Sequence, residues 1–215
     1  MGILPECYVF GAGEFFGGVP EVSEHDIVIA ADGGYAALER LGLKADYVIG
    51  DFDSLPEIPP QKNITRMPQE KDVTDMRAAL ELGLKKGFEI FHIYGGTGGR
   101  FEHTLANIQC LAWLAQSGAR GYLYDKDCTM TAITNGSLSY DEKCSGYISV
   151  FAHSGTANGI YLSGLKYPLD NATVTDVFPL GVSNEFTGTC STVTVKDGTL
   201  IVIYPAGTAP VILCP

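Results

Sequence analysis

The fold of this chain is decided by residues 90–116, which read IFHIYGGTGGRFEHTLANIQCLAWLAQ. The apolar run Ile90–Tyr94 is typical of a buried strand, and four glycines in the next five residues interrupt it. A helix is predicted after the glycines, because apolar residues recur on one helical face at Phe101, Leu105, Ile108, Ala112 and Ala115. Strand, glycine loop and helix in this order predict a parallel sheet with right-handed crossovers.

The same alternation extends over the first 130 residues. Strands are predicted at Cys7–Gly11, Ile27–Ala31, Tyr47–Gly50, Ile64–Met67, Ile90–Tyr94 and Gly121–Tyr124. Helices are predicted at Tyr35–Leu41, Met76–Lys86 and Phe101–Gln116. Residues 1–130 therefore read as an α/β domain with a mostly parallel sheet flanked by helices.

The pattern changes after about Cys128, where short β-rich runs follow one another without a convincing helix. The runs are Gly146–Phe151, Gly159–Leu162, Ser191–Val195 and Leu200–Tyr204. Lys196-Asp197-Gly198 resembles the turn of a hairpin that joins Thr192–Val195 to Thr199–Ile203. Residues 136–215 are therefore predicted to form an all-β sandwich or barrel.

Composition excludes several classes of protein. The 215 residues are 46% hydrophobic and carry a formal net charge of −11, which argues against a general nucleic-acid binder. No apolar run is long enough to cross a membrane, and no secretory signal is visible, so we expect a cytoplasmic protein. The six cysteines lack the spacing of a zinc site and are expected to be reduced, mostly small apolar fillers.

The glycine loop is the strongest chemical signal. Gly95, Gly96, Gly98 and Gly99 are costly in conformational entropy for a simple turn, whereas a backbone nest around phosphate requires such residues. Arg100 follows directly and is suited to clamp an anion. Neither the Gly-Lys-Ser/Thr of a P-loop nor the glycine spacing of a dinucleotide fold is present.

A second glycine signal follows the predicted strand Ile27–Ala31. Asp32-Gly33-Gly34 leads into a helix, whose free N–H groups suit a phosphate or a nucleoside. An equally good reading is a tight turn in which Asp32 is the helix N-cap.

Carboxylates follow two further elements. Asp51 and Asp53 are two residues apart after the strand Tyr47–Gly50, a spacing that favours Mg²⁺ between them, although a solvated turn has the same sequence. Before the next helix, Asp72 or Thr74 can be the N-cap, and Asp75 suits the helix dipole or the same cation. His103, Asn107, Ser183 and Asn184 have no firm role from the residues alone.

Together these groups predict an enzyme that binds a magnesium nucleotide, because phosphoryl or pyrophosphoryl transfer needs mainly alignment and charge neutralisation. The successive blocks further resemble those of the thiamine pyrophosphokinase family, in its order and approximate spacing. The blocks are Asp32-Gly33-Gly34, Gly50–Leu55, Lys71–Asp75, Gly95–His103 and Ser183-Asn184.

The resemblance implies an N-terminal α/β domain that binds ATP, a C-terminal β-sandwich, and a homodimer that holds thiamine between its subunits. It places Mg²⁺ on Asp51, Asp53 and Asp75. It places the nucleotide near Asp32, Gly33, Gly34, Gly95, Gly96, Thr97, Gly98, Gly99, Arg100 and His103. On the thiamine side it places Lys71, Tyr167, Ser183 and Asn184.

The family's activity would be transfer of the pyrophosphoryl group of ATP to thiamine. Our hypothesis for its mechanism is that Arg100 and Mg²⁺ neutralise charge and that a nearby aspartate, such as Asp72, accepts the proton. Glu102 is also expected on the nucleotide side, but it departs from the family, in which an aspartate is usual here, so its carboxylate reaches one methylene further.

Three other functions are compatible with parts of the pattern. A pyrophosphokinase for another alcohol, such as a hydroxymethyl-pterin, would share the ATP side. An Asp-x-Asp hydrolase or glycosyltransferase explains the carboxylates but not the glycine nest with Arg100. A sensor that binds nucleotide or thiamine without turnover needs fewer carboxylates than this chain has.

Overall fold

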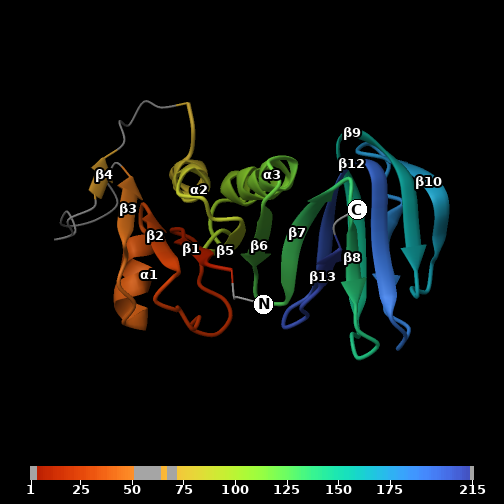
Figure 1. The fold of residues 1–215 in the computed structure, drawn as a ribbon, viewed down its shortest axis with the longest axis horizontal. Coiled ribbons are helices and arrows are strands. Elements are labelled where there is room, and N and C mark those ends of the chain that lie inside the picture. Colours follow the sequence, from red (N-terminus) through yellow and green to blue (C-terminus); the bar gives the residue numbers. More distant parts are fainter. Residues whose placement is uncertain (1–3, 51–63, 67–71, 214–215) are drawn as a thin grey trace. The chain divides into compact units, whose positions relative to one another are not determined.

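The computed structural model describes residues 4–50, 64–66 and 72–213 of the chain. These residues form two compact units, which are described separately below (Figure 1). The first unit contains residues up to 110 together with 121–126, and the second contains residues 111–120 and those from 127 onward. Among the described helices, none is long and apolar enough to cross a bilayer.

The sheet of the first unit has the strand order β6-β5-β1-β2-β3-β4. Its strands are β1 (Glu6–Phe10), β2 (Ile27–Ala31), β3 (Tyr47–Gly50), β4 (Ile64–Arg66), β5 (Ile90–Tyr94) and β6 (Arg120–Tyr124). β1 pairs in parallel with both β2 and β5, and β3 pairs in parallel with both β2 and β4. The prediction of an α/β fold with a mostly parallel sheet is therefore confirmed.

Helices α1 (Gly34–Leu41) and α2 (Asp75–Lys85) cover opposite faces of this sheet (Figure 1). Leu38 of α1 packs in a cluster with Tyr8 and Phe10 of β1. Gly83 of α2 lies against Cys7 of β1 on the other side, and an added Cβ would be 2.9 Å from the Cys7 sulfur. Because successive strand residues point to opposite faces, the two helices sandwich the sheet.

Helix α3 (Phe101–Gln116) has the predicted bounds, but its predicted apolar face is only partly correct, because Ala112 is buried whereas the first two positions are not. Phe101 is 79% exposed and Leu105 is 52% exposed. The buried side instead contains Asn107, Cys110, Leu111 and Leu114. These four positions follow the i, i+3, i+4, i+7 rule equally well. Apolar spacing missed this face because its first member is a polar asparagine.

The second unit is all-β after the end of α3. Its strands are β7 (Cys128–Thr134), β8 (Ser137–Tyr140), β9 (Tyr147–Ser163), β10 (Leu169–Thr175), β11 (Gly181–Glu185), β12 (Ser191–Pro205) and β13 (Val211–Leu213). The described strands among them pair antiparallel. Their inward side chains form one apolar core that includes Leu138, Val150, Leu162 and Val193. The all-β prediction is confirmed.

The hairpin predicted at Lys196-Asp197-Gly198 is wrong, because β12 runs without a turn from Ser191 to Pro205. The first half of β12 pairs with β8 and the second half with β7. On its other edge, β12 pairs with β9 along both halves. Gly198 has φ 119°, and the register with β9 is irregular at this point. The glycine therefore allows a long strand to bend from one group of partners to the next, as β-bulges do.

Candidate active site

A cavity lies beyond the carboxyl ends of the central strands of the first unit. β2 lies on one side of β1, whereas β5 and β6 lie on the other, so the connections after β1 and β5 leave in opposite directions. Open α/β sheets bind ligands at such a switch point. The cavity has a volume of about 250 Å³, near the lower end of the range for small-ligand pockets. Its lining comprises Gly11, Ala12, Gly13, Ala31, Asp32, Thr74, Asp75, Met76, Gly95, Gly96, Thr97, Gly99, Arg100, His103, Thr104 and Asn107.

Two glycine loops, one after β1 and one after β5, form the centre of this lining. The Gly13 N–H donates to the Gly95 carbonyl at 2.8 Å, and the Glu14 N–H donates to the Thr97 carbonyl at 2.9 Å. A Cβ on Gly13 would lie 2.2 Å from the Thr97 carbonyl oxygen, so only glycine permits this approach. The loop after β1 was missed by sequence reasoning, although Gly11-Ala12-Gly13 directly after a buried strand was an available signal.

Gly95 shows why the second loop requires glycine. Its φ is 62°, in the left-handed region, and an added Cβ would lie 2.4 Å from the Gly11 carbonyl oxygen. Any other residue would meet both a conformational penalty and a steric clash. The sequence prediction that these glycines are more than an ordinary turn therefore has a structural reason.

The backbone amides of the second loop are available to an anion. The N–H groups of Gly96, Thr97 and Gly98 donate no hydrogen bond to any residue that the structure describes. Buried N–H groups are nearly always paired in folded proteins, and Gly96 and Thr97 are buried. Consecutive amides of this kind form an anion-binding nest when a ligand is present.

Two helix N-termini reach the same cavity. Thr74 is the N-cap of α2, where its hydroxyl accepts the Arg77 N–H at 3.2 Å, and Arg100 directly precedes α3. Thr74, Asp75 and Arg100 all line the cavity. The positive ends of two helices add to the attraction for an anion. Thr74 is confirmed as one of the two predicted caps, and Asp75 is the first helical residue.

Asp32 is a strained residue at the edge of the cavity. Its φ of 50° lies in the left-handed region, which aspartate tolerates better than most residues, and its N–H donates to the Ile49 carbonyl at 2.7 Å. The reading of Asp32 as an N-cap is wrong, because α1 begins at Gly34 and its N-cap is Gly33, with no side-chain cap bond. Such backbone strain is common at ligand sites.

Arg100 begins a short charged sequence at the mouth of the cavity. Its Nη2 contacts the Nε2 of His103, and its Nε lies 3.6 Å from Oε1 of Glu102. Arg100 and His103 line the cavity, whereas Glu102 is exposed and does not. Of the predicted nucleotide residues, Gly33, Gly34 and Gly98 also lie outside the lining. Asp51, Asp53 and Lys71 lie outside the described residues.

Family comparisons agree with this arrangement. The model of the thiamin pyrophosphokinase catalytic domain matches residues 20–123, and that of the thiamin pyrophosphokinase vitamin B1 binding domain matches residues 137–200. A thiamine pyrophosphokinase of Bacillus subtilis is 33% identical over 187 residues, covering 84% of this chain and 87% of the relative. This chain belongs to the thiamin pyrophosphokinase family.

Solved structures of the family have the same fold. The crystal structure of thiamine pyrophosphokinase from Bacillus subtilis has a TM-score of 0.82 and 29% identity, and the match covers 94% of this chain and 99% of that one. The thiamin pyrophosphokinase of Geobacillus thermodenitrificans has a TM-score of 0.78 and 26% identity, covering 94% and 97%.

In the region that matches the vitamin B1 binding domain, the predicted residues differ in their accessibility. Ser183 is exposed and left-handed, with φ 55°. Asn184 is only 3% exposed, and its side chain accepts the Tyr167 N–H at 2.9 Å and donates to the Tyr167 carbonyl at 2.7 Å. Tyr167 is itself exposed. Asn184 therefore holds the backbone that presents Tyr167.

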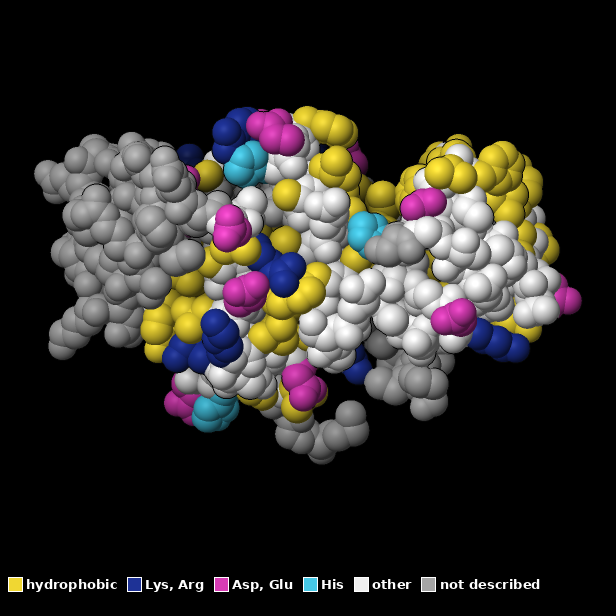
Figure 2. Space-filling model, turned by 90° about the horizontal axis from the view of Figure 1, so that it is seen from above, with side chains coloured by type: hydrophobic (Ala, Val, Ile, Leu, Met, Phe, Trp, Pro, Cys, Tyr) yellow, Lys and Arg dark blue, Asp and Glu magenta, His cyan; other side chains and the backbone are white. Residues whose placement is uncertain are grey.

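The all-β unit also carries several large hydrophobic side chains that are exposed. Figure 2 shows hydrophobic side chains gathered over part of the all-β unit, while charges of both signs are interspersed on the α/β unit. The large exposed side chains of the all-β unit include Tyr147, Val177, Phe178, Leu180 and Val182. Clustered apolar exposure of this kind usually marks a surface that is covered by a partner or a ligand.

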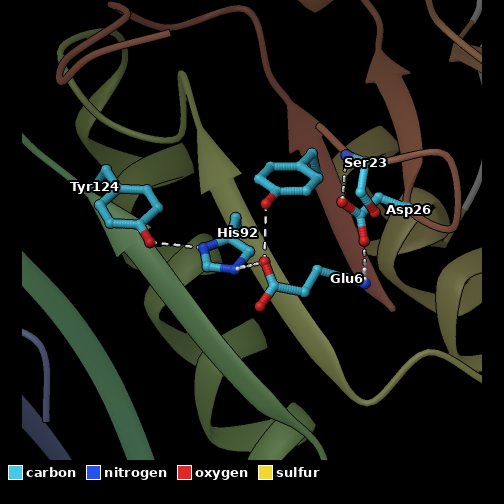
Figure 3. A network of polar contacts seen from close by, with 6 residues as sticks. Glu6, Ser23, Asp26, His92 and Tyr124 are labelled. Carbon is cyan, nitrogen blue, oxygen red and sulfur yellow. Dashed lines mark hydrogen bonds and ion pairs between the residues drawn. The ribbon is translucent and has the colours of Figure 1, made fainter. Parts of the chain in front are cut away.

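A separate polar network lies on one face of the first sheet and does not line the cavity (Figure 3). His92 of β5 lies with Nδ1 2.6 Å from the Tyr124 hydroxyl and Nε2 3.0 Å from Oε2 of Glu6. The Tyr8 hydroxyl donates to the same Glu6 oxygen at 2.8 Å. Burial lowers the pKa of His92 and outweighs the opposing effect of Glu6. A neutral ring fits the network if Tyr124 donates to Nδ1 and Nε2–H faces Glu6.

Proposed function

We propose that this chain transfers the pyrophosphoryl group of ATP to the hydroxyl of thiamine, giving thiamine diphosphate and AMP. The observation that carries the proposal is the nest of Gly96, Thr97 and Gly98, whose N–H groups donate to no described residue, in a loop that lines the cavity together with two helix N-termini. Membership of the thiamin pyrophosphokinase family supports thiamine as the acceptor.

The cavity combines cationic and anionic groups in a way that fits a magnesium nucleotide. Arg100, the amides and the helix dipoles attract phosphate, whereas Asp32 and Asp75 repel it unless a cation lies between them. Asp51 and Asp53 follow β3 in the sequence. β3 lies beside β2 in the sheet, and Asp32 directly follows β2. The described residues alone contain no group of three metal-binding side chains. Asp51, Asp53 and Asp75 together would supply the hard carboxylate oxygens that Mg²⁺ prefers.

The reaction needs alignment more than covalent help from the protein. The thiamine hydroxyl oxygen attacks the β-phosphorus of ATP in line, the bond from that phosphorus to the α,β-bridging oxygen breaks, and AMP leaves. Mg²⁺ bound by the carboxylates would offset charge on the phosphate oxygens. Arg100 and the loop amides donate hydrogen bonds to the migrating group, which holds it in place and stabilises the developing charge.

We assign acceptance of the hydroxyl proton to Asp72. This residue is exposed and lies two positions before the cap Thr74, at the N-terminus of the helix that reaches the cavity. An ionised carboxylate there can take the proton without disturbing the buried nest. His103 lies against Arg100 and lines the cavity, so we place it beside the nucleotide.

Thiamine binding is proposed for Lys71, Tyr167 and Ser183, with Asn184 holding Tyr167 in position. The support is the match to the vitamin B1 binding domain and the exposure of Tyr167 and Ser183. A homodimer is also proposed, and the exposed apolar side chains of the all-β unit support it. A cytoplasmic location stays a prediction from the sequence.

A product assay tests the function. The purified chain is incubated with ATP, Mg²⁺ and thiamine, and the products are separated by chromatography. We expect thiamine diphosphate and AMP in equal amounts, no product with a chelator, and no turnover by the Asp51→Asn or Asp53→Asn variants. ADP as the product would contradict pyrophosphoryl transfer. ATP binding without AMP would indicate another acceptor or a sensor, and full activity of either variant would contradict the metal assignment.

A further inference from the structure

The glycine loop after β5 has side-chain anchors as well as backbone anchors. The buried Asn107 donates from Nδ2 to the Gly96 carbonyl at 2.8 Å. Thr97, which is only 4% exposed, donates from its hydroxyl to Oδ1 of Asp125 at 2.7 Å. Both anchors come from elements that follow the loop in the chain, because Asn107 is on α3 and Asp125 directly follows β6.

The anchors account for the free amides of the loop. Three successive carbonyls of the loop accept hydrogen bonds. The Gly95 carbonyl accepts from the Gly13 N–H, the Gly96 carbonyl from the Asn107 side chain, and the Thr97 carbonyl from the Glu14 N–H. In a planar trans peptide the following N–H points opposite to each carbonyl. The N–H groups of Gly96, Thr97 and Gly98 therefore point away from these anchors and make no bond to a described residue.

Asp125 differs from the carboxylates of the cavity. Asp125 is not among the lining residues, whereas Thr97 is. Asp125 is therefore connected to the cavity by its hydrogen bond with Thr97. A hydrogen bond from a hydroxyl to an ionised carboxylate is short and stronger than a neutral one. Without this acceptor, the hydroxyl of a buried side chain would be unpaired at the centre of the nest.

We infer that Asp125 is a positioning residue for the ATP triphosphate: it fixes Thr97, and Thr97 fixes the loop in the conformation whose amides bind phosphate. The inference rests on the proposed function for the identity of the nucleotide. It adds a residue outside the family blocks found in the sequence and outside the cavity lining.

The test measures binding of a non-hydrolysable ATP analogue with Mg²⁺ by calorimetry. Asp125→Ala and Thr97→Val each remove the hydrogen bond, and we expect each to weaken binding about ten-fold. The double variant should be no weaker than either single variant, because both changes remove the same interaction. Asp125→Asn keeps an acceptor oxygen and should fall between wild type and Asp125→Ala.

Asp127→Ala is the matched control, because it removes an exposed carboxylate two residues away and should bind like wild type. In activity assays, Asp125→Ala and Thr97→Val should raise KM for ATP and leave KM for thiamine unchanged. A purely structural role would instead change both KM values and the circular dichroism spectrum. That result would overturn the inference.

Two other results would also overturn it. Normal analogue binding by Thr97→Val, with weak binding by Asp125→Ala, would mean that Asp125 acts on the nucleotide directly. Additive losses in the double variant would mean that the two residues act separately. Failure of the proposed function is distinguishable, because it appears as a wild-type chain that binds the analogue but forms no thiamine diphosphate. In that case, analogue binding by the Asp125 and Thr97 variants still tests the inference.

Discussion

The two units use the same unusual backbone conformation for different purposes. In the α/β unit, Asp32 and Gly95 have positive φ and both lie at the cavity. In the all-β unit, Gly198 has positive φ where β12 changes partners, and Ala157 of the apolar core lies beside it. A left-handed residue between a strand and a helix thus shapes a ligand site, whereas one within a strand redirects the strand.

Buried asparagines show the same contrast. Asn107 donates to the Gly96 carbonyl and belongs to the cavity lining. Asn184 bonds both backbone groups of Tyr167 and thereby fixes an exposed aromatic residue. Each side chain stabilises a loop rather than reacting itself. The comparison predicts that substitutions in the loops of the α/β unit change the kinetic constants for ATP. Substitutions in the all-β unit should instead change the free energy of unfolding and the KM for thiamine.

The largest effect is expected from Gly95→Ala. The new Cβ would clash with the Gly11 carbonyl oxygen and force the loop out of its left-handed conformation. Displacing a binding loop by about 1 Å can cost about 100-fold in rate, so we expect at least that loss in kcat/KM for ATP. Steady-state kinetics measure it.

Gly87→Ala is the matched control for that change. Gly87 also has positive φ, at 89°, but its Cβ would meet nothing within 4 Å. We expect a loss of about 1 kcal/mol in stability and unchanged kinetics. Equal kinetic losses in both variants would show that the glycine loop has no special role.

Asn184→Ala is expected to have the next largest effect. It leaves the Tyr167 N–H and carbonyl without their partner, at a cost of about 3 kcal/mol in the free energy of unfolding. Trp113, the only tryptophan, belongs to the second unit, so its fluorescence follows unfolding of that unit in denaturant. KM for thiamine should rise, while KM for ATP should not.

Asn158→Ala serves as the control in the same unit. Asn158 is exposed, and its side chain accepts the Thr173 hydroxyl at 3.1 Å, so its loss should cost about 0.5 kcal/mol or less. A change in KM for ATP in the Asn184 variant would contradict the division of roles between the units.

The smallest effect concerns the dependence of stability on pH. Burial lowers the pKa of His92 below its ordinary value of 6.5, so the unfolded chain binds more protons in that range. Its stabilising contribution is complete above about pH 6.5 and is lost as the pH falls through the lowered pKa of the folded state. Glu6, Asp26, Tyr8, Tyr122 and Tyr124 surround this ring.

His92→Gln should therefore flatten the change in unfolding free energy between about pH 7.5 and pH 5. Denaturation at the two pH values measures the change. His25→Gln is the control, because it removes an exposed histidine, and its unfolding free energy should be close to that of wild type at both pH values. An unchanged pH dependence in the His92 variant would mean that the pKa of His92 is the same in the folded and the unfolded chain.

Sequence reasoning worked best where local pattern and topology agree. Parallel strands such as Ile27–Ala31 are buried on both faces, and apolar runs reveal them. The glycine loop was visible because Gly95 and its neighbours are costly unless the backbone needs them. Because parallel strands end at the same edge of a sheet, the order of the blocks predicted a common site there, and Asp32, Asp75 and Arg100 do line one cavity.

The remaining features depend on contacts that a local pattern does not encode. Gly198 was taken for a hairpin turn because the sequence does not reveal that β9 accompanies both halves of β12. The buried face of α3 was misjudged because Asn107 is polar but bonds a carbonyl in the interior. Asp125 was missed because its partner Thr97 is 28 residues away in the sequence.

The most direct test of the central claim is an experimental structure of the chain with Mg²⁺, a non-hydrolysable ATP analogue and thiamine. The account predicts phosphate oxygens within about 2.7–3.2 Å of the amide nitrogens of Gly96, Thr97 and Gly98, with Mg²⁺ on Asp51, Asp53 and Asp75. A triphosphate bound away from the glycine loop, or a metal ion held by other residues, would contradict it.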